Sequence, residues 1–272
     1  MDEKEKIKTV SALFIYPVKS LKGLSVQKFE IGAKGPMMDR RWMVVDKEGR
    51  FLSQRVEPKM ALITVELFPD KILLKAPRVP PVIVTRANKS EVRSVVIWKD
   101  TVDAIDQGNQ AAEWLTEFLG FDARLVFLPD ETVRKVNPKY ATADTDQVSF
   151  ADAYPLLVIS EASLADLNWR LKTPIQMNRF RPNLVISGCE PYEEDTWKRF
   201  RIGDMLFECV KPCSRCVTVT IDQHTAEKDP EPLEVLATYR KEEGGIMFGQ
   251  NVIPKNQGIV SIGAEVKVLE TR

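Results

Sequence analysis

Two cysteines separated by two residues are the side chains of this sequence best suited to chemistry. Cys213 and Cys216 enclose Ser214 and Arg215, and a run that alternates apolar and polar residues follows over positions 217–222. A thiolate beside a cation can bind a soft metal or attack an electrophile. The alternating run predicts that the pair lies in a tight loop leading into a β-strand, whereas a thioredoxin-type redox pair begins a helix.

Other uses of these thiols require partners. A standard structural zinc site needs a second Cys-x-x-Cys, which the four cysteines do not provide, although a looser set that adds Cys189 and Cys209 stays open. A cysteine nucleophile needs a histidine base, and the one histidine, His224, stands in what we expect to be a turn. Packing of Cys213 and Cys216 as small apolar side chains is a further open alternative.

Several cations stand at the edges of predicted strands and are candidate ligands for an anion. They are Lys19, Arg40, Arg41, Arg179 and Arg181. Lysine and arginine at such positions bind phosphate or carboxylate through charge-assisted hydrogen bonds. The sequence contains no glycine-rich phosphate loop, so it does not predict ordinary nucleotide binding.

The composition limits the class of protein. The 272 residues include 39 basic and 39 acidic side chains, a formal net charge of +0, which predicts no general affinity for nucleic acid or anionic membranes. No run of about 18 apolar residues predicts a membrane span, and the charged N-terminus does not resemble a signal peptide. We therefore expect a cytoplasmic protein whose cysteines are reduced.

Short β-prone runs dominate the first half of the chain. Strands are predicted over residues 10–16, 24–31, 41–45, 61–68, 71–75, 81–85 and 92–98. A helix is predicted over 109–119, capped by Asn109 and closed by Gly120, and a further strand over 123–128. This half is expected to form a β-barrel or sandwich.

A polar segment over 129–147 has little periodicity and predicts a boundary or a long surface loop. Helices are expected beyond it over 160–171, with Ser160 as the cap, and over 231–240. The second half is predicted to form strands over residues 156–159, 184–186, 205–210, 246–253 and 258–269. The predicted fold class is mainly β with flanking helices.

Six short motifs occur in the order in which MOSC proteins carry them. They cover residues 16–20, 39–42, 160–164, 180–183, 213–216 and 248–250. The chain therefore resembles the MOSC family, in the branch of the mitochondrial amidoxime-reducing component and its bacterial relatives. The resemblance implies an N-terminal MOSC β-barrel domain over 8–128 and a cofactor-binding MOSC β-barrel domain over 129–272.

The resemblance also implies a molybdenum cofactor, a pterin dithiolene with a terminal phosphate, and no requirement for pyridoxal phosphate. Cys216 matches the family's molybdenum-ligating cysteine, and Cys213 is left without a role. Asn251 replaces an aromatic neighbour of the cofactor. The positions that match the family's contacts to the pterin and its phosphate are Lys19, Ser20, Arg40, Arg181, Asn183, Ser214 and Arg215.

The activity implied by the resemblance is the reduction of N-hydroxylated compounds, such as amidoximes, hydroxylamines and N-hydroxylated bases. Electrons are expected from a separate protein, either ferredoxin-like or a b-type haem protein with its reductase. Asp152 is a candidate proton donor, and Ala153 and Tyr154 replace hydroxyl residues of the family. The alternative is a carrier of the cofactor, or a sulfur-transfer module, without its own turnover.

Overall fold

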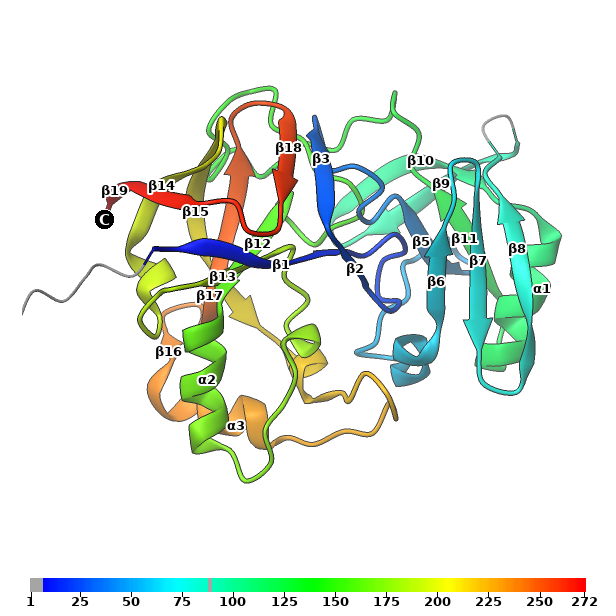
Figure 1. The fold of residues 1–272 in the computed structure, drawn as a ribbon. Helices are drawn as coiled ribbons and strands as arrows, with labels where there is room; N and C mark the ends of the chain where they lie inside the picture. The colour runs from blue at the N-terminus through cyan, green and yellow to red at the C-terminus, as the bar shows by residue number, and fades with distance from the viewer. Residues whose placement is uncertain (1–6, 88–89) are drawn as a thin grey trace, which may run out of the picture.

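The computed structural model describes residues 7–87 and 90–272 of the chain and shows a mainly β protein (Figure 1). Its strands form four sheets, and the three α-helices of the described residues lie at the outside. The predicted fold class is therefore confirmed. None of these helices has the length and hydropathy of a membrane-spanning segment.

The largest sheet, sheet A, has nine strands. Eight of them follow one another across the sheet in the order β19 (Val266–Thr271), β14 (Trp197–Ile202), β15 (Met205–Arg215), β17 (Gly245–Pro254), β12 (Leu156–Ser160), β13 (Leu184–Ser187), β1 (Thr9–Ile15) and β2 (Leu24–Val26). The ninth, β16 (Lys241–Glu242), pairs with β17. Since β1 lies antiparallel to β13, with Leu13 opposite Leu184, main-chain hydrogen bonds cross the predicted division at residue 129.

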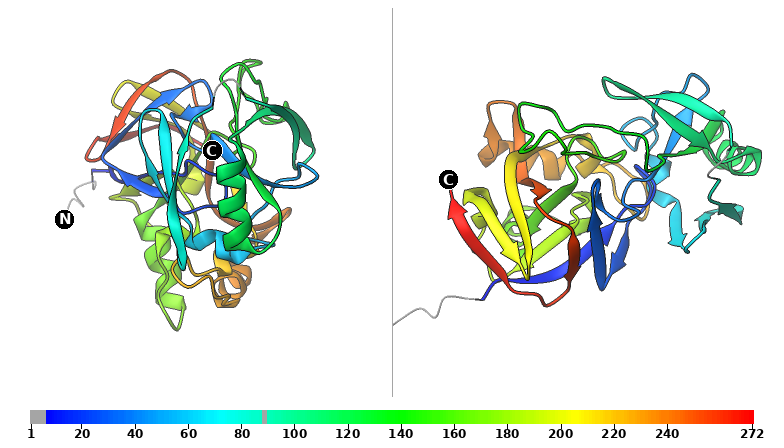
Figure 2. Two further views of the ribbon diagram at one scale, coloured as in Figure 1. Left: turned by 90° about the vertical axis from the view of Figure 1, so that its right-hand side faces the viewer. Right: turned by 90° about the horizontal axis from the view of Figure 1, so that it is seen from above.

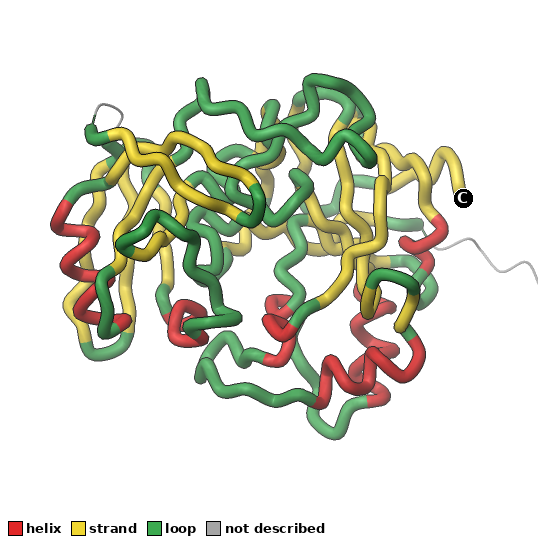
Figure 3. The backbone as a smooth tube through the Cα atoms, turned by 180° about the vertical axis from the view of Figure 1, so that it is seen from behind, coloured by secondary structure: helices red, strands yellow, loops and turns green. Residues whose placement is uncertain are grey.

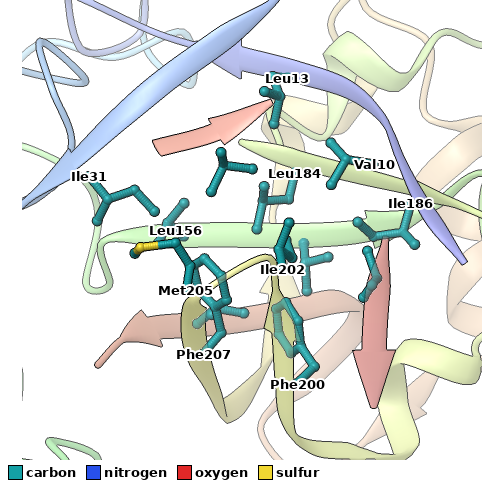
Figure 4. Packing of buried hydrophobic residues seen from close by; sticks show 14 of the residues in the cluster. Val10, Leu13, Ile31, Leu156, Leu184, Ile186, Phe200, Ile202, Met205 and Phe207 are labelled. Carbon is teal, nitrogen blue, oxygen red and sulfur yellow. The ribbon is translucent and has the colours of Figure 1, made fainter. Parts of the chain in front are cut away.

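The core enclosed by sheet A is built from alternating strands. Along β14, Phe200 and Ile202 are buried and Arg201 is exposed, which is the period of a half-buried strand, and an irregularity at Arg199 brings Trp197 into the core as well. Figure 4 shows side chains of β1, β12, β13, β14 and β15 converging on one cluster. Such close packing fixes the ends of β1, β13 and β15 relative to one another.

Three smaller sheets complete the fold. Sheet B contains β5 (Trp42–Asp46), β11 (Ala123–Phe127), β10 (Asp100–Asp106) and β9 (Val92–Ile97). Sheet C contains β18 (Gly258–Ser261), β3 (Lys28–Gly32) and β4 (Gly35–Pro36), and sheet D contains β6 (Thr64–Leu67), β7 (Lys71–Ala76) and β8 (Val79–Thr85). Helix α1 (Asn109–Leu119) packs against β11 and β8, as the left view of Figure 2 shows.

Helices α2 (Glu161–Arg170) and α3 (Glu231–Tyr239) cover part of sheet A (Figure 1). The predicted cap of α2 is confirmed, because Ser160 Oγ accepts a hydrogen bond from the Ser163 backbone N–H at 3.0 Å. Gly120 ends α1 in the left-handed conformation, as predicted. The prediction of Asn109 as the cap of α1 is wrong, since Gly108 occupies that position.

The segment around the cysteine pair differs from the prediction. Strand β15 continues through Cys213 to Arg215, because residues 211–215 keep pairing with β17, and residues Val217–Thr220 form a 3₁₀ turn instead of a strand. The alternating run begins beyond the last pair of β15 with β17, Arg215 opposite Ile246, so it has no strand of β17 beside it to pair with. The cysteines therefore stand at the end of a strand.

The close approach of β17 to β12 depends on Gly249, which has φ +79°. A Cβ atom there would lie 2.8 Å from the Val158 carbonyl oxygen and 2.6 Å from Ile159, so Gly249→Ala adds a clash to the backbone strain. We expect it to lower the free energy of unfolding by about 1–3 kcal/mol more than backbone strain alone would.

The matched variant is Gly263→Ala, because Gly263 has φ +83° and open space around its Cα. It should cost only the left-handed strain, about 1–2 kcal/mol. Denaturant unfolding of both variants measures the difference. Equal losses would show that the β12–β17 contact does not require glycine.

Candidate functional site

One cleft brings together all ten site residues predicted from the sequence. They are Lys19, Ser20, Arg40, Asp152, Arg181, Asn183, Ser214, Arg215, Cys216 and Asn251. They come from the loop after β1, the turn before β5, the loop before β12, the turn before β13, the end of β15, and β17. Much of the chain in this middle part of the molecule is loop, as the tube in Figure 3 shows, and the packed strands on either side hold the loops in place.

The cleft carries an excess of positive charge. One carboxylate, Asp152, and six cations line it: Lys19, Arg40, Arg55, Arg179, Arg181 and Arg215. In a chain whose formal net charge is +0, this local imbalance favours an anionic ligand. A phosphate bound by cations from both halves of the chain needs no glycine-rich loop.

Two arginines that line the cleft pack against the ring of one buried tyrosine. The guanidinium carbons of Arg40 and Arg181 each lie 4.2 Å from the centroid of the Tyr16 ring. Burial raises the pKa of Tyr16 to about 12, so its neutral hydroxyl donates to the Pro182 carbonyl oxygen at 3.1 Å. Burial and the charge of Arg40 lower the pKa of Arg181 to about 10, and an anion would relieve that repulsion.

Buried guanidinium nitrogens without partners test whether the cleft fits a cofactor phosphate. Arg181 Nη2 and Arg215 Nε are buried and have no hydrogen-bond partner within the described part of the chain. Their other nitrogens are fixed: Arg181 donates to the Leu21 carbonyl at 2.7 Å and Arg215 to the Phe180 carbonyl at 2.6 Å. Because buried donors are nearly always paired, these two fit the oxygens of an anion. The residues present therefore fit the phosphate of the cofactor that the family resemblance implies.

Backbone strain coincides with these side chains. Ser20, Arg40 and Arg181 have φ values of 67°, 49° and 57°, in the left-handed region that residues other than glycine seldom adopt. Each such residue costs on the order of 1–3 kcal/mol, and such residues cluster at functional sites. The three residues with this strained backbone all line the cleft.

Asn183 holds the cleft in shape through contacts with the protein. Its side-chain amide donates to the Asp39 carboxylate and to the Phe14 carbonyl, each at 3.1 Å, and its carbonyl oxygen accepts from Arg40 Nη1 at 3.1 Å. Asp39 itself is buried and accepts from the Tyr16 backbone N–H and from Arg40. The structure thus gives Asn183 a positioning role beside its predicted contact with the cofactor.

Cys216 has the environment of a thiolate. Arg55 Nε donates to Cys216 Sγ at 3.1 Å. Burial tends to raise the pKa of the Cys216 thiol, but hydrogen bonds from Thr218 and the hydrogen bond and charge of Arg55 outweigh it and lower that pKa. Cys213 Sγ accepts instead from Arg215 Nη1 at 3.0 Å. The two cysteines therefore face different cations, and the pair is asymmetric.

Asp152 is ionised in this structure. Its carboxylate pairs with Lys19 Nζ and, at 3.5 Å, with Arg55 Nη2. The charge and hydrogen bond of Lys19 and the charge of Arg55 lower the pKa of Asp152 well below its usual range. A proton donor must carry a proton at working pH, so the arrangement favours an electrostatic role for Asp152 over the predicted one.

Ser214 and Asn251 lie on the paired strands β15 and β17. Ser214 Oγ donates to the Gly244 carbonyl at 3.2 Å, and Asn251 Nδ2 donates to the Pro212 carbonyl at 3.3 Å. Gly245 has no Cβ, and one would lie 2.2 Å from Ser214 Oγ. Both polar side chains are therefore held at the wall of the cleft by main-chain carbonyls.

Other candidates from the sequence do not join the cleft or have structural partners. Arg41 donates to the Leu128 carbonyl, outside the cleft, and Arg179 pairs with Asp222 at 2.9 Å. His224 is an exposed turn residue, as predicted. Cys189 and Cys209 are buried in the core of sheet A, and no three His, Cys, Asp or Glu side chains of residues 7–87 and 90–272 are grouped to hold a metal ion. The looser zinc set is not formed.

Sequence reasoning missed Arg55, Asp39 and Arg134. Arg55 is 161 residues from its partner Cys216, and its loop carries no motif. Asp39 stood inside a motif as an unremarked neighbour of Arg40. Arg134 lies in the polar segment predicted as a surface loop, although its buried guanidinium donates to the carbonyls of Ser149 and Ala151 at 2.9 and 2.6 Å.

Two family models match most of the chain. The one described as MOSC N-terminal beta barrel domain matches residues 7–122, and the one described as MOSC domain matches residues 145–267. With the thiolate at the end of β15 and the cation-rich cleft, these matches define a MOSC protein. The chain belongs to this family, in the branch that contains the mitochondrial amidoxime-reducing components, as its relatives show.

Mitochondrial amidoxime reducing component 2 of Rattus norvegicus is 38% identical over 248 residues, which cover 87% of this chain and 73% of that protein. Mitochondrial amidoxime-reducing component 1 of Mus musculus is 37% identical over 283 residues, covering 97% and 83%. Among solved structures, the YUAD protein from Bacillus subtilis covers 95% of this chain and 93% of its own, at 11% identity and a TM-score of 0.41. That likeness is too low to support a conclusion.

Replacement of Lys19 by methionine tests the buried ammonium through pH dependence. Desolvation outweighs the attraction of Asp152 and lowers the pKa of Lys19 from its ordinary value of 10.5 to about 8. Between these pH values the unfolded chain holds a proton that the folded chain has released, so the free energy of unfolding should rise with pH. The contribution of Lys19 should be at most about 1.4 kcal/mol per pH unit, and Lys19→Met should lack it.

Urea unfolding across this pH window measures the difference between the two proteins. Lys47→Met, at an exposed lysine, is the matched control and should behave as the wild type. The free energy of unfolding of the wild type minus that of Lys19→Met should rise with pH. If it stays constant or falls, the lowered pKa of Lys19 is contradicted.

Proposed function

We propose that the chain is a molybdenum cofactor-dependent oxidoreductase that reduces N-hydroxylated compounds with electrons from a separate redox protein. The observation that carries this proposal is the cleft itself, where Cys216, whose Sγ accepts a hydrogen bond from Arg55, lines the same hollow as two arginines with buried, unpaired nitrogens. Relatives named amidoxime-reducing components support the reaction class. A cytoplasmic location stays a prediction from composition.

Different residues of the cleft would bind different parts of the cofactor. Cys216 Sγ would supply the thiolate ligand to the metal, since a soft thiolate suits this metal and its dithiolene. Arg181 and Arg215 would bind the phosphate through their unpaired nitrogens. When bound, the cofactor supplies the two-electron chemistry that removes oxygen from nitrogen.

The Lys19–Asp152 pair is placed to manage protons at the cleft. The reduction takes up two electrons and two protons and releases one water, and the electrons come from the partner protein. At neutral pH the proton of the pair resides on Lys19 Nζ, which also donates to the Phe150 carbonyl at 2.9 Å. The Asp152 carboxylate, whose side chain is 61% exposed, would accept a hydrogen bond from the substrate and orient it.

Replacement of Cys216 by alanine tests the proposed function. The variant should lose essentially all reduction of benzamidoxime with an artificial electron donor, because it lacks the metal's thiolate ligand. Cys213→Ala, three residues earlier on β15, is the matched variant and should keep its bound molybdenum. Full turnover by Cys216→Ala with metal still bound would contradict the ligand assignment.

The same assay separates the alternative of a cofactor carrier or sulfur-transfer module. A carrier would contain the molybdenum cofactor but reduce no N-hydroxylated compound with any electron donor tested. Wild-type turnover of benzamidoxime that depends on molybdenum would exclude a role limited to carrying.

A further inference from the structure

A second hollow lies beside the cleft, and the proposed binding of the cofactor does not involve it. We call it the Trp98 groove, and its apolar wall consists of Trp98, Val102, Val133, Val136, Pro138 and Ala153. Asp152 and Ala153 line both the groove and the cleft, so the two hollows adjoin at these residues. A ligand that spans these residues would occupy both hollows.

Trp98 occupies an unfavourable position for a large side chain. It lies in the two-residue turn between β9 and β10, where Ile97 pairs with Asp100, and its φ is 55°. Turns of this kind favour Asn, Asp or Gly. The side chain also remains 42% exposed. A large indole in a strained turn, with this much of its surface uncovered, points to a ligand.

The indole is connected to the proposed catalytic thiolate through a single side chain. The guanidinium of Arg55 lies 4.4 Å from the centroid of the Trp98 ring, and its Nε donates to Cys216 Sγ at 3.1 Å. Phe51, which lines the cleft, packs against the same indole with ring centroids 4.8 Å apart. The aromatic wall of the groove and the thiolate of the cleft thus belong to one contact network.

The groove is preformed because Arg134 joins its two sides. Arg134 is buried, and its Nε donates to the Asp100 carboxylate at 2.8 Å, on the hairpin that carries Trp98. Its Nη2 donates to the Asp152 carbonyl at 3.1 Å, on the loop shared with the cleft. Separating the two sides would leave a buried charge unpaired, which is costly. Binding of a ligand here therefore requires little ordering of the groove, and its free-energy cost is small.

We propose that the Trp98 groove binds the planar aromatic part of a neutral N-hydroxylated substrate while its N–OH group reaches the cleft. The inference rests on the proposed function and names its substrate class. An aromatic ring can stack on the indole and cover the neighbouring valines. Three cations line the groove, Lys99, Arg134 and Lys135, against the two carboxylates Asp100 and Asp152, and this excess disfavours a cationic ligand. Aryl amidoximes and N-hydroxylated bases should therefore bind more tightly than small aliphatic ones.

The experiment measures binding without turnover. Equilibrium dialysis without an electron donor compares benzamidoxime with acetamidoxime on the holoprotein and on Trp98→Asn. Asparagine suits the turn, so the thermal midpoint should stay level or rise, while the affinity for benzamidoxime should fall about tenfold. Acetamidoxime has no ring to place in the groove, so its affinity should not change. Trp169→Asn, at an indole that is 83% exposed on α2, is the matched control.

A second variant tests the groove independently if Trp98→Asn does not fold. Val133 is 53% exposed and lines the groove, so Val133→Lys should leave the fold intact and weaken benzamidoxime binding to a similar degree. Wild-type affinity for benzamidoxime in both variants would overturn the groove assignment, and benzamidoxime reduction would still support the proposed function. If the wild type reduces neither compound, the proposed function fails, while dialysis still decides whether the groove binds arenes.

Discussion

The buried carboxylate of Asp39 holds the two halves of the cleft together. It accepts from the Tyr16 backbone N–H at 2.8 Å, from Arg40 Nη1 at 2.6 Å and from Asn183 Nδ2 at 3.1 Å. These partners belong to the end of β1, to the turn before β5 and to the turn before β13. Since a buried charge must be paired, the three segments are confined to one arrangement.

The positive charge that Asp39 leaves unneutralised favours an anionic ligand. It compensates Arg40, so the second guanidinium on the Tyr16 ring, that of Arg181, keeps an uncompensated charge. The chain retains buried donors without partners and strained backbone at these positions, and such features persist when surrounding structure enforces them. An anion that fills the cleft would satisfy the donors and so stabilise the folded chain.

Much of this arrangement could be predicted from the sequence, for identifiable reasons. Periodicity predicted the three helices, and the motif order brought Lys19, Arg181 and Cys216 to one site because the family's fold does so. Contacts between distant segments left no local signal, as for Arg55 with Cys216. The end of β15 was mispredicted because a short alternating run becomes a strand only where a neighbour remains to pair with it.

The central claim is that the cleft is built for a phosphate-bearing pterin whose metal binds Cys216. Elemental and pterin analysis of the protein purified from a molybdenum-replete host tests it most directly. The account predicts about one molybdenum and one pterin per chain, with the metal lost in Cys216→Ala. Stoichiometric zinc without pterin, or a molybdenum content that the variant leaves unchanged, would contradict it.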